Sequence, residues 1–271
     1  MAKLAGRKSL LKCSGTAVTF IGEAVSTSDN TKYQITDTSK RVLDRTAAMF
    51  VHRLDGLGDY LSVATTNTTT VTFGSAHNLE VNDLVYNIDR DAYRLVLTTP
   101  TSTSITVDSV TSQTAGDEFN FYPTETTSDY ELNRLSGYFT YGSATSRTIL
   151  VSGSYLPLTT IGEAYEFTLA CSASNEDCTV FSDTFVERLQ TIKDVTLSVS
   201  KYYVDSEFQL KLIDGSPIMV EIFIDSSSDF YAKVWCLPSS DEVSSSVDGI
   251  VEESLELEGT LDADSRAITY D

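Results

Sequence analysis

The sequence is poor in the residues that carry catalysis and metal binding. Its 271 residues include only two histidines and four cysteines, and these lie far apart along the chain. They are His52, His77, Cys13, Cys171, Cys178 and Cys236. The seven-residue step from Cys171 to Cys178 is not a chelating spacing, so we expect no zinc site.

The motifs of common enzyme families are missing as well. The chain has no G-x-S-x-G, G-x-x-x-x-G-K, H-E-x-x-H or C-x-x-C pattern. Carboxylate pairs such as Asp89 and Asp91 are non-specific in so acidic a chain. We therefore expect no enzyme, no cofactor and no metal; a glycosidase, which needs only two carboxylates, is the weaker alternative.

Long apolar runs are also absent. No stretch is long enough to cross a bilayer, and the opening "MAKLAGRKSLLK" lacks the apolar core of a signal peptide. We expect a protein that is not exported, that inserts in no membrane and that keeps its cysteines reduced.

Positive charge is scarce. Lysine and arginine total 19 against 39 acids, so the formal net charge is −20 and the pI is about 4.3. Such a surface repels nucleic acid, because phosphate binding needs cations. The opening segment is the exception, with four bases and no acid, whereas Leu237 to Asp271 holds ten acids and one base, Arg266. The four bases are Lys3, Arg7, Lys8 and Lys12.

What the sequence has in abundance is apolar–polar alternation with a period of two, which is typical of half-buried β-strands. Val195, Leu197 and Val199 alternate with polar residues, and the pattern returns in "EFQLKLI", "IMVEIFID" and "FYAKVWCL". Breaks rich in Ser, Thr, Gly and Asp separate such runs. The predicted fold class is all-β, and we expect Val195, Leu197, Val199, Val220, Ile222 and Trp235 in the core.

Only one stretch favours a helix. In "SDTFVERLQTIK", residues 182–193, Phe185, Leu189 and Ile192 fall on one helical face, and Thr184 with Glu187 forms a capping-box pattern. We therefore predict at most one short helix, placed there.

Residues 56–127 differ in character from their flanks. They are dense in Thr, Ser and short β-branched runs, with Val71 and Phe73 before a turn at His77. We interpret them as a small β module inserted into a parent domain made of residues 1–55 and 128–271, with 1–15 as a flexible basic arm. A long decorated loop within a single sandwich is the alternative.

Several blocks resemble the tail tube (major tail) proteins of long-tailed bacteriophages. They are "YQITDTSKRVLDRTAAMFV", "YELNRLSGYFTYGSATSRTILVSGSYLPL", "DCTVFSDTFVERLQTIKDVTLSVSKYY", "LIDGSPIMVEIFID" and "VDGIVEESLELEGTLD". The likeness rests on the order of the blocks, because no single motif is diagnostic. The stretch "VTFGSAHNLEVNDLVYNID" is similar to the small Ig- or SH3-like modules of phage structural proteins.

The resemblance implies a tail-tube β-sandwich or barrel subunit that forms hexameric rings, stacked into a hollow tube that delivers DNA. It implies contacts with tape measure protein, tail terminator and distal tail proteins, with DNA only in transit. It places the protein in the virion tail, assembled in the cytoplasm of the infected bacterium, with the inserted module on the outside.

Charge suggests which residues would serve such a tube. In "ESLELEGTL", Leu255 and Leu257 point inward, so Glu256 and Glu258 share the opposite face. We expect these two in the lumen, with Glu252 and Glu253 near it or at the ring interface; an outer surface is the alternative. The arm with Lys3, Arg7, Lys8 and Lys12 is the candidate contact between rings.

Two other functions fit parts of the pattern. A tube of a secretion or contractile injection machine shares the architecture and need not pass DNA. A carbohydrate-binding or adhesin module would use exposed aromatic residues, for which Tyr202, Tyr203 and Tyr231 are the candidates.

Overall fold

The structure is a computed structural model that describes most of the chain. It covers residues 9–53, 60–65, 69–108, 114–144, 148–179, 186, 188–203, 206–225, 230–245, 249 and 251–270. Strands dominate these residues, and within them α1 (Glu207–Asp214) is the only α-helix, joined by one 3₁₀ turn, η1 (Thr38–Lys40). The predicted all-β fold class is confirmed.

The chain divides into two compact units. One comprises Met1–Thr16 with Pro157–Asp271, and the other is Ala17–Leu156. The chain therefore enters the second unit from β1 and returns to the first at Pro157. The grouping of residues 1–55 with 128–271 as one tail-tube domain stays a prediction.

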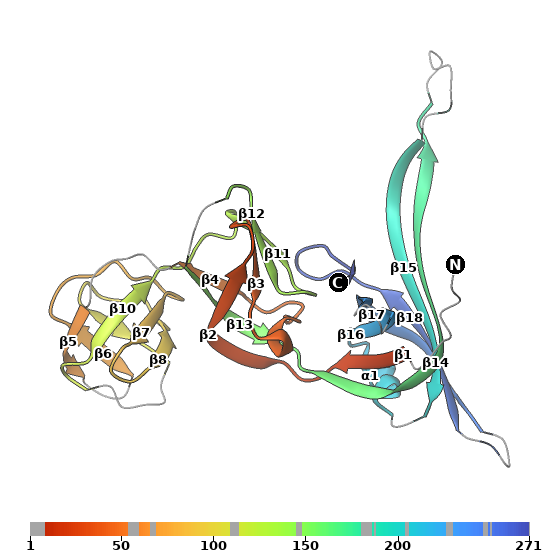
Figure 1. Ribbon diagram of the computed structural model, residues 1–271, viewed down its shortest axis with the longest axis horizontal. Helices are drawn as coiled ribbons and strands as arrows, with labels where there is room; N and C mark the ends of the chain where they lie inside the picture. The colour runs from red at the N-terminus through yellow and green to blue at the C-terminus, as the bar shows by residue number, and fades with distance from the viewer. Residues whose placement is uncertain are drawn as a thin grey trace. The chain divides into compact units, whose positions relative to one another are not determined.

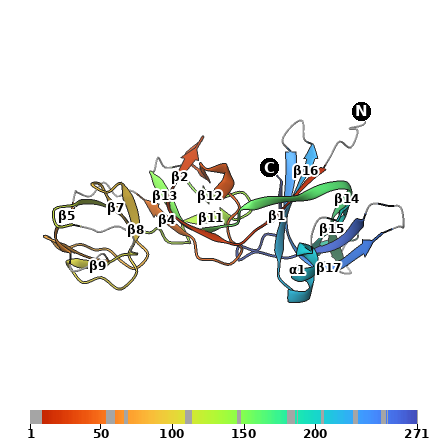
Figure 2. The ribbon, with the colours of Figure 1, turned by 90° about the horizontal axis from the view of Figure 1, so that it is seen from below.

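The strands of the first unit pair in a closed circuit. In the order β16-β1-β14-β15-β18-β17, each strand pairs with the next, β16 also pairs with β17, and β19 adds to β17 (Figures 1 and 2). The strands are β1 (Ser9–Ser14), β14 (Leu158–Asp177), β15 (Arg188–Tyr202), β16 (Ile218–Asp225), β17 (Phe230–Ser244), β18 (Glu252–Gly259) and β19 (Ile268–Tyr270). The circuit is a six-stranded barrel.

The barrel interior is filled by the apolar face of every strand in the circuit. Leu197, Val220 and Leu257 are among the residues of this core, and Phe208 of α1 packs into it. The six residues predicted for the core, Val195, Leu197, Val199, Val220, Ile222 and Trp235, are all buried, which confirms that prediction. Apolar–polar alternation in the sequence predicted the core residues of β15 and β16, whereas Trp235 lies between the buried Val234 and Cys236 of β17.

The helix was predicted in the wrong place. Residues 188–193 belong to β15, while residues 182–185 and 187 lie outside the described part of the chain. Conversely "EFQLKLI", predicted as a strand, forms α1. Phe208 is buried and Leu212 follows it by one helical turn, and Gly215 ends the helix with a left-handed φ of 61° and a backbone N–H bonded to Leu212. An eight-residue helix offers too few turns for its period to outweigh the apparent alternation.

The second unit holds two six-stranded sheets. The first has the order β11-β12-β3-β2-β13-β4 around a core that includes Phe20, Ile35, Val51 and Phe139. Its strands are β2 (Val18–Thr27), β3 (Lys32–Ile35), β4 (Phe50–Arg53), β11 (Tyr130–Asn133), β12 (Tyr138–Tyr141) and β13 (Ile149–Tyr155).

The other sheet of this unit is built from residues 60–122. Its order is β8-β7-β10-β5-β6-β9, and the Val96–Val107 bridge brings its two outer strands together. The strands are β5 (Tyr60–Thr65), β6 (Thr70–Phe73), β7 (Leu84–Asn87), β8 (Ala92–Leu95), β9 (Ser104–Thr106) and β10 (Glu118–Tyr122). This sheet has a core of its own, in which the rings of Phe119 and Phe121 meet Phe73 edge-on at 5.4 and 5.1 Å.

The two sheets of the second unit meet through a small apolar contact and a polar one. Leu84 and Tyr122, which belong to the sheet of residues 60–122 (called the smaller sheet below, because its strands are shorter in total), pack with Leu150 of β13. A Cβ on Gly22 of β2 would overlap the ring of Tyr93, and Gly22 has φ of 67°, so glycine is required for this approach. The smaller sheet is thus seated on β2 and β13 by close packing.

His52 joins the same contact. Its Nε2 lies 2.9 Å from Ser152 Oγ and its Nδ1 lies 3.3 Å from Thr124 Oγ1. Thr124 in turn donates its backbone N–H to Asp83 Oδ1 at 2.8 Å. Because the imidazole is fully buried, desolvation lowers the pKa of His52 from 6.5 to about 3.

We predict that His52 stays neutral in the folded chain down to about pH 4.5. Its folded pKa of about 3 lies below the unfolded value, so the unfolded chain gains the proton first and stability falls as pH drops below 6.5. At pH 5 the loss from this group is about 2 kcal/mol. An NMR titration of the two imidazoles, assigned with His77→Gln, measures the pKa directly. A His52 midpoint near pH 6.5 contradicts the prediction.

Candidate assembly interface

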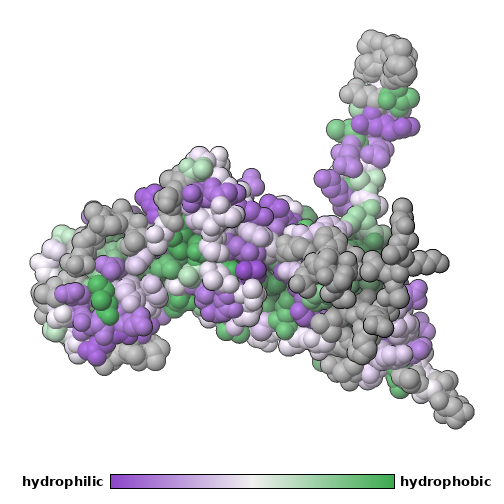
Figure 3. Space-filling view, in the orientation of Figure 1, coloured by the Kyte–Doolittle hydropathy of each residue, from purple (hydrophilic) through white to green (hydrophobic). Residues whose placement is uncertain are grey.

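A two-stranded ribbon projects from the barrel. Beyond Cys171, β14 pairs only with β15, from Ser172–Asp194 to Asp177–Arg188, and its side chains are largely exposed (Figure 1). Val186, Leu189 and Ile192 are 57, 62 and 73% exposed in this segment. Figure 3 shows hydrophobic patches among the hydrophilic surface of the ribbon. A lone two-stranded ribbon is marginally stable in water, and exposed apolar residues mark contact surfaces.

Four strands of the barrel form a sheet with unpaired margins. β14, β15, β18 and the second half of β17 pair in that order, and all three pairings are antiparallel. β1 pairs with β14 only as far as Ala164, while β16 pairs with β17 only as far as Cys236 and β19 only as far as Val234. Among the described residues, β14 from 166 to 177 and β17 from 237 to 244 therefore have one margin without a strand partner.

One face of this four-stranded sheet is acidic. Directly paired residues point to the same side, so the rows Thr196–Glu258 and Ser198–Glu256 place Glu256 and Glu258 together, with Ser198 Oγ donating to Glu256 at 2.6 Å. The same side carries six exposed acids: Glu166, Asp194, Glu242, Glu252, Glu256 and Glu258. In the described parts of these strands, Lys193 and Lys201 lie on the opposite side, with Ala173 and Glu253.

Glu253 departs from the expected position. It lies on the core side of β18, alternating with Glu252, and is 1% exposed. Its carboxylate forms an ion pair with Lys201, which is directly opposite on β15 and lies 5.5 Å from the Phe208 ring. Burial raises the pKa of the nearby Asp241, and the charge of Lys201 partly offsets this. Glu253 is therefore a partner of a buried lysine and does not belong to the exposed acidic face.

Lys12 does not belong to a flexible arm, in contrast to the prediction. Lys12 lies in β1, between β14 and β16, where it pairs with Glu221 at 2.8 Å and stands over the Phe223 ring. The alternating "SLLKCS" completes the barrel, so this lysine is fixed by the sheet. Lys3, Arg7 and Lys8 lie outside the described residues.

The aromatic candidates lie at two places. Tyr202 contacts the ring of Tyr165 at 5.4 Å, and Tyr203 follows it at the end of β15. Tyr231 packs with Phe223 across β16 and β17 at 5.5 Å. Within the described chain, no cluster of three or more metal-ligating side chains occurs, and no helix is long and apolar enough to span a membrane.

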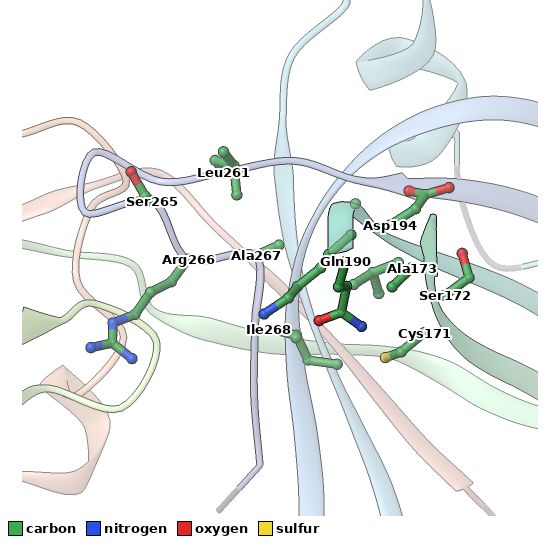
Figure 4. Close-up of a pocket in the computed structure, with 13 residues that line it drawn as sticks. Cys171, Ser172, Ala173, Gln190, Asp194, Leu261, Ser265, Arg266, Ala267 and Ile268 are labelled. Carbon is green, nitrogen blue, oxygen red and sulfur yellow. The ribbon is translucent and has the colours of Figure 1, made fainter. Parts of the chain in front are cut away.

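A cleft of about 800 Å³ opens at the base of the ribbon. Cys171, Ala173 and Gln190 line it from the ribbon, and Leu261, Arg266 and Ile268 line it from the C-terminal loop (Figure 4). Val195 marks its floor at the end of the barrel core. Its walls are therefore mixed, with aliphatic side chains beside Lys193 and Arg266 and a single acid, Asp194.

The sequence reasoning found Glu252, Glu256 and Glu258 but missed Glu166, Asp194 and Glu242 on the same face. Asp194 directly precedes the core residue Val195, so the alternation predicts its side. Glu166 follows the exposed Tyr165, and Glu242 precedes the exposed Val243, so the local pattern does not assign these two acids to a face. The sequence pattern does not predict that β14, β15, β18 and β17 are neighbours in this order, because pairing between strands distant in the chain leaves no local signal.

Solved structures similar to this chain include two from gene transfer agent particles. No family model matches the chain, and no curated protein matches it. A chain from the virion of a native gene transfer agent particle is similar over 42% of this chain and 88% of its own, with 15% identity and a TM-score of 0.35. A chain from the tail of an empty gene transfer agent particle, refined with C6 symmetry, is similar over 42% of this chain and 87% of its own, with 14% identity and a TM-score of 0.36.

We predict that substitutions in the Lys201–Glu253 pair lower the stability of the chain strongly, whereas substitutions on the acidic face hardly change it. Lys201→Met leaves a buried carboxylate uncompensated and costs about 3–5 kcal/mol of unfolding free energy. The double variant Lys201→Met with Glu253→Gln recovers much of that loss. Glu256→Gln, on the exposed face, changes stability by less than about 0.5 kcal/mol. Urea unfolding followed by the single tryptophan, Trp235, measures all three. Equal losses for Lys201→Met and Glu256→Gln would refute this assignment.

Proposed function

We propose that this chain is a structural protein of a phage-type tail. Its copies join side by side in hexameric rings, and the rings stack into a tube through which DNA passes. The proposal takes the ring and tube from the sequence resemblance and the sheet from the structure. It is supported most by one observation: a four-stranded sheet with both margins unpaired and one acidic face.

The margins are suited to closing a ring. β14 and β17 run in opposite directions, because three antiparallel steps separate them. The β17 margin of one copy therefore meets the β14 margin of the next copy in antiparallel orientation, as do all strands inside the sheet. Closure satisfies the backbone groups at both margins and removes the exposed edges that otherwise promote uncontrolled aggregation.

The resulting barrel has a fitting size. Six copies of a four-stranded sheet supply about 24 strands, and with about 4.8 Å between strands tilted by roughly 40° the backbone ring is about 48 Å across. Such a ring has room for inward side chains and for a DNA duplex. A closed ring also fixes which face is concave for every copy at once.

The acidic face belongs on the concave side in this proposal. Glu252, Glu256 and Glu258, joined by Glu166, Asp194 and Glu242, then repeat around the lumen, whereas Lys193 and Lys201 of β15 lie on the opposite side of the sheet. Phosphates that pass near such a wall are repelled at short range and do not form the ion pairs that would hold DNA in place. Serine and threonine between the acids keep the wall hydrated.

The remaining parts have places in the same assembly. The ribbon, with Val186, Leu189 and Ile192, extends past its own barrel and contacts other copies along the tube. Residues 56–127 form the inserted module on the outside. Tape measure protein fills the lumen before DNA, and terminator and distal tail proteins close the two ends. The acidic wall favours DNA passage over the secretion-tube alternative.

Disulfide trapping tests the ring. In a background with Cys171→Ser and Cys178→Ser, Ser240→Cys on β17 is combined with Glu166→Cys, Thr168→Cys or Ala170→Cys on β14. Because a disulfide needs Cα atoms within about 7 Å, we expect one of these pairs to give a covalent ladder that ends at the hexamer.

Thr196→Cys with Ser240→Cys is the matched control for this trapping. Thr196 shares the exposed face but belongs to β15, inside the sheet, so it stays far from the margin of another copy. Electron microscopy of the same samples reports rings and tubes. Monodisperse monomers, with no ladder from any β14–β17 pair, would end the proposal.

Thiol labelling tests the lumen. In the same background, Glu258→Cys in assembled tubes reacts with a small maleimide but is protected from a large polyethylene glycol maleimide, because the closed wall excludes the polymer. Ser75→Cys, an exposed residue of the module, reacts with both reagents. If the large reagent modifies Glu258→Cys as fast as Ser75→Cys, the acidic face lies outside the tube.

A further inference from the structure

α1 presents an apolar face that its own barrel does not cover. Phe208 points into the core, whereas Leu210 and Ile213, one helical turn apart, are 56 and 78% exposed. Ile213 has the most exposed side chain among the large apolar residues that the structure describes. Glu207 and Asp214 flank this face at the two ends of the helix.

The cleft lies at the other end of the same barrel. β15 runs from Val195, which lines the cleft, to Lys201, whose Nζ lies 5.5 Å from the Phe208 ring of α1. Six residues of strand separate these points, so the cleft and α1 are about 20 Å apart along the strand. The ribbon projects from the cleft end and α1 covers the opposite end (Figure 1).

We propose that the Leu210–Ile213 face of α1 docks in the ribbon-base cleft of a second copy, and that this is the contact between successive rings. The inference rests on the proposed tube. A knob at one end of a subunit and a socket at the other make a head-to-tail contact, which repeats without closing and so builds length.

The chemistry of the two surfaces is complementary. The cleft offers aliphatic walls at Val195, Leu261 and Ile268, and its volume of about 800 Å³ admits several side chains. Lys193 and Arg266 line it, so Asp214 at the end of α1 enters a mainly cationic surrounding. Docking removes Leu210 and Ile213 from water and pairs the acid beside them.

Docking by a second copy also distinguishes the contact that sets tube length, which is ring stacking, from the contact that sets tube width, which is ring closure. The β14 and β17 margins, which close the ring, share no residue with the Leu210–Ile213 face. The cleft, by contrast, includes Cys171, Ser172 and Ala173, which belong to the β14 margin, so a ring must be in place for neighbouring clefts to stand at regular spacing. Stacking thus follows ring closure.

Substitutions on α1 and in the cleft test the contact. Ile213→Glu buries a charge if docking occurs, so we expect on the order of a tenfold or greater loss of stacked tubes in electron microscopy and sedimentation. Leu97→Glu, at a leucine of the module that is 52% exposed, is the matched control and leaves tubes intact. Circular dichroism and thermal unfolding stay unchanged in both, because both side chains are exposed.

A charge swap gives the sharper result. Asp214→Lys and Lys193→Glu each reduce stacking, and the double variant restores it, which a merely structural role for either residue does not produce. Tubes of ordinary length from Ile213→Glu, or a double variant no better than the single ones, would overturn the docking.

The disulfide ladder separates this inference from the proposed function. If Ile213→Glu keeps the β14–β17 hexamer ladder but loses stacked tubes, the ring and the docking both stand. If the ladder persists and tubes also persist, only the docking fails. If the parent chain gives neither ladder nor tubes, the proposed function fails, and the docking fails with it.

Discussion

Backbone N–H and C=O groups at the margin of a β-sheet must be hydrogen-bonded to a strand or to water, and a long margin left to water invites another chain. In this protein six strands close on themselves around an apolar core, yet β14 and β17 are longer than the barrel needs. Their surplus length leaves two margins, 166–177 and 237–244, on one sheet. The sheet has four antiparallel strands, so its two outer strands, β14 and β17, run in opposite directions. Copies can therefore add side by side with antiparallel pairing at every junction.

Charge is distributed by the same pleat that builds the barrel. Residues of one parity in β14, β15 and β18 fill the core, and those of the other parity carry acids, serine and threonine. The exception is instructive: Glu253 has the parity of the core, and it is tolerated there because Lys201 lies directly across the strand pair. A face that is acidic throughout costs repulsion within each copy, and hydration and counterions offset that cost.

In the second unit, the sheet of β5 to β10 packs on β2 and β13 through a few specific contacts. Gly22 allows the ring of Tyr93 to approach β2. The buried His52 and Ser152 and the half-buried Thr124 satisfy one another where the chain crosses between the two sheets. A neutral imidazole suits this place, since it hydrogen-bonds on both sides without burying a charge. Packing and hydrogen bonds together seat the smaller sheet on its neighbour.

Local pattern alone determined much of this protein: the all-β class, the core residues of β15 and β16, and the shared face of Glu256 and Glu258 all follow from a period of two. The local pattern gave the wrong prediction for "EFQLKLI", which alternates like a strand but forms a short helix. It was also wrong for "SDTFVERLQTIK", predicted as a helix, part of which belongs to β15. Only the tertiary structure decided that β14, β15, β18 and β17 are neighbours, that their margins are unpaired, and that Glu253 is buried. The physical reason is that strand order and edge pairing depend on contacts between residues distant in the chain, which no local periodicity encodes.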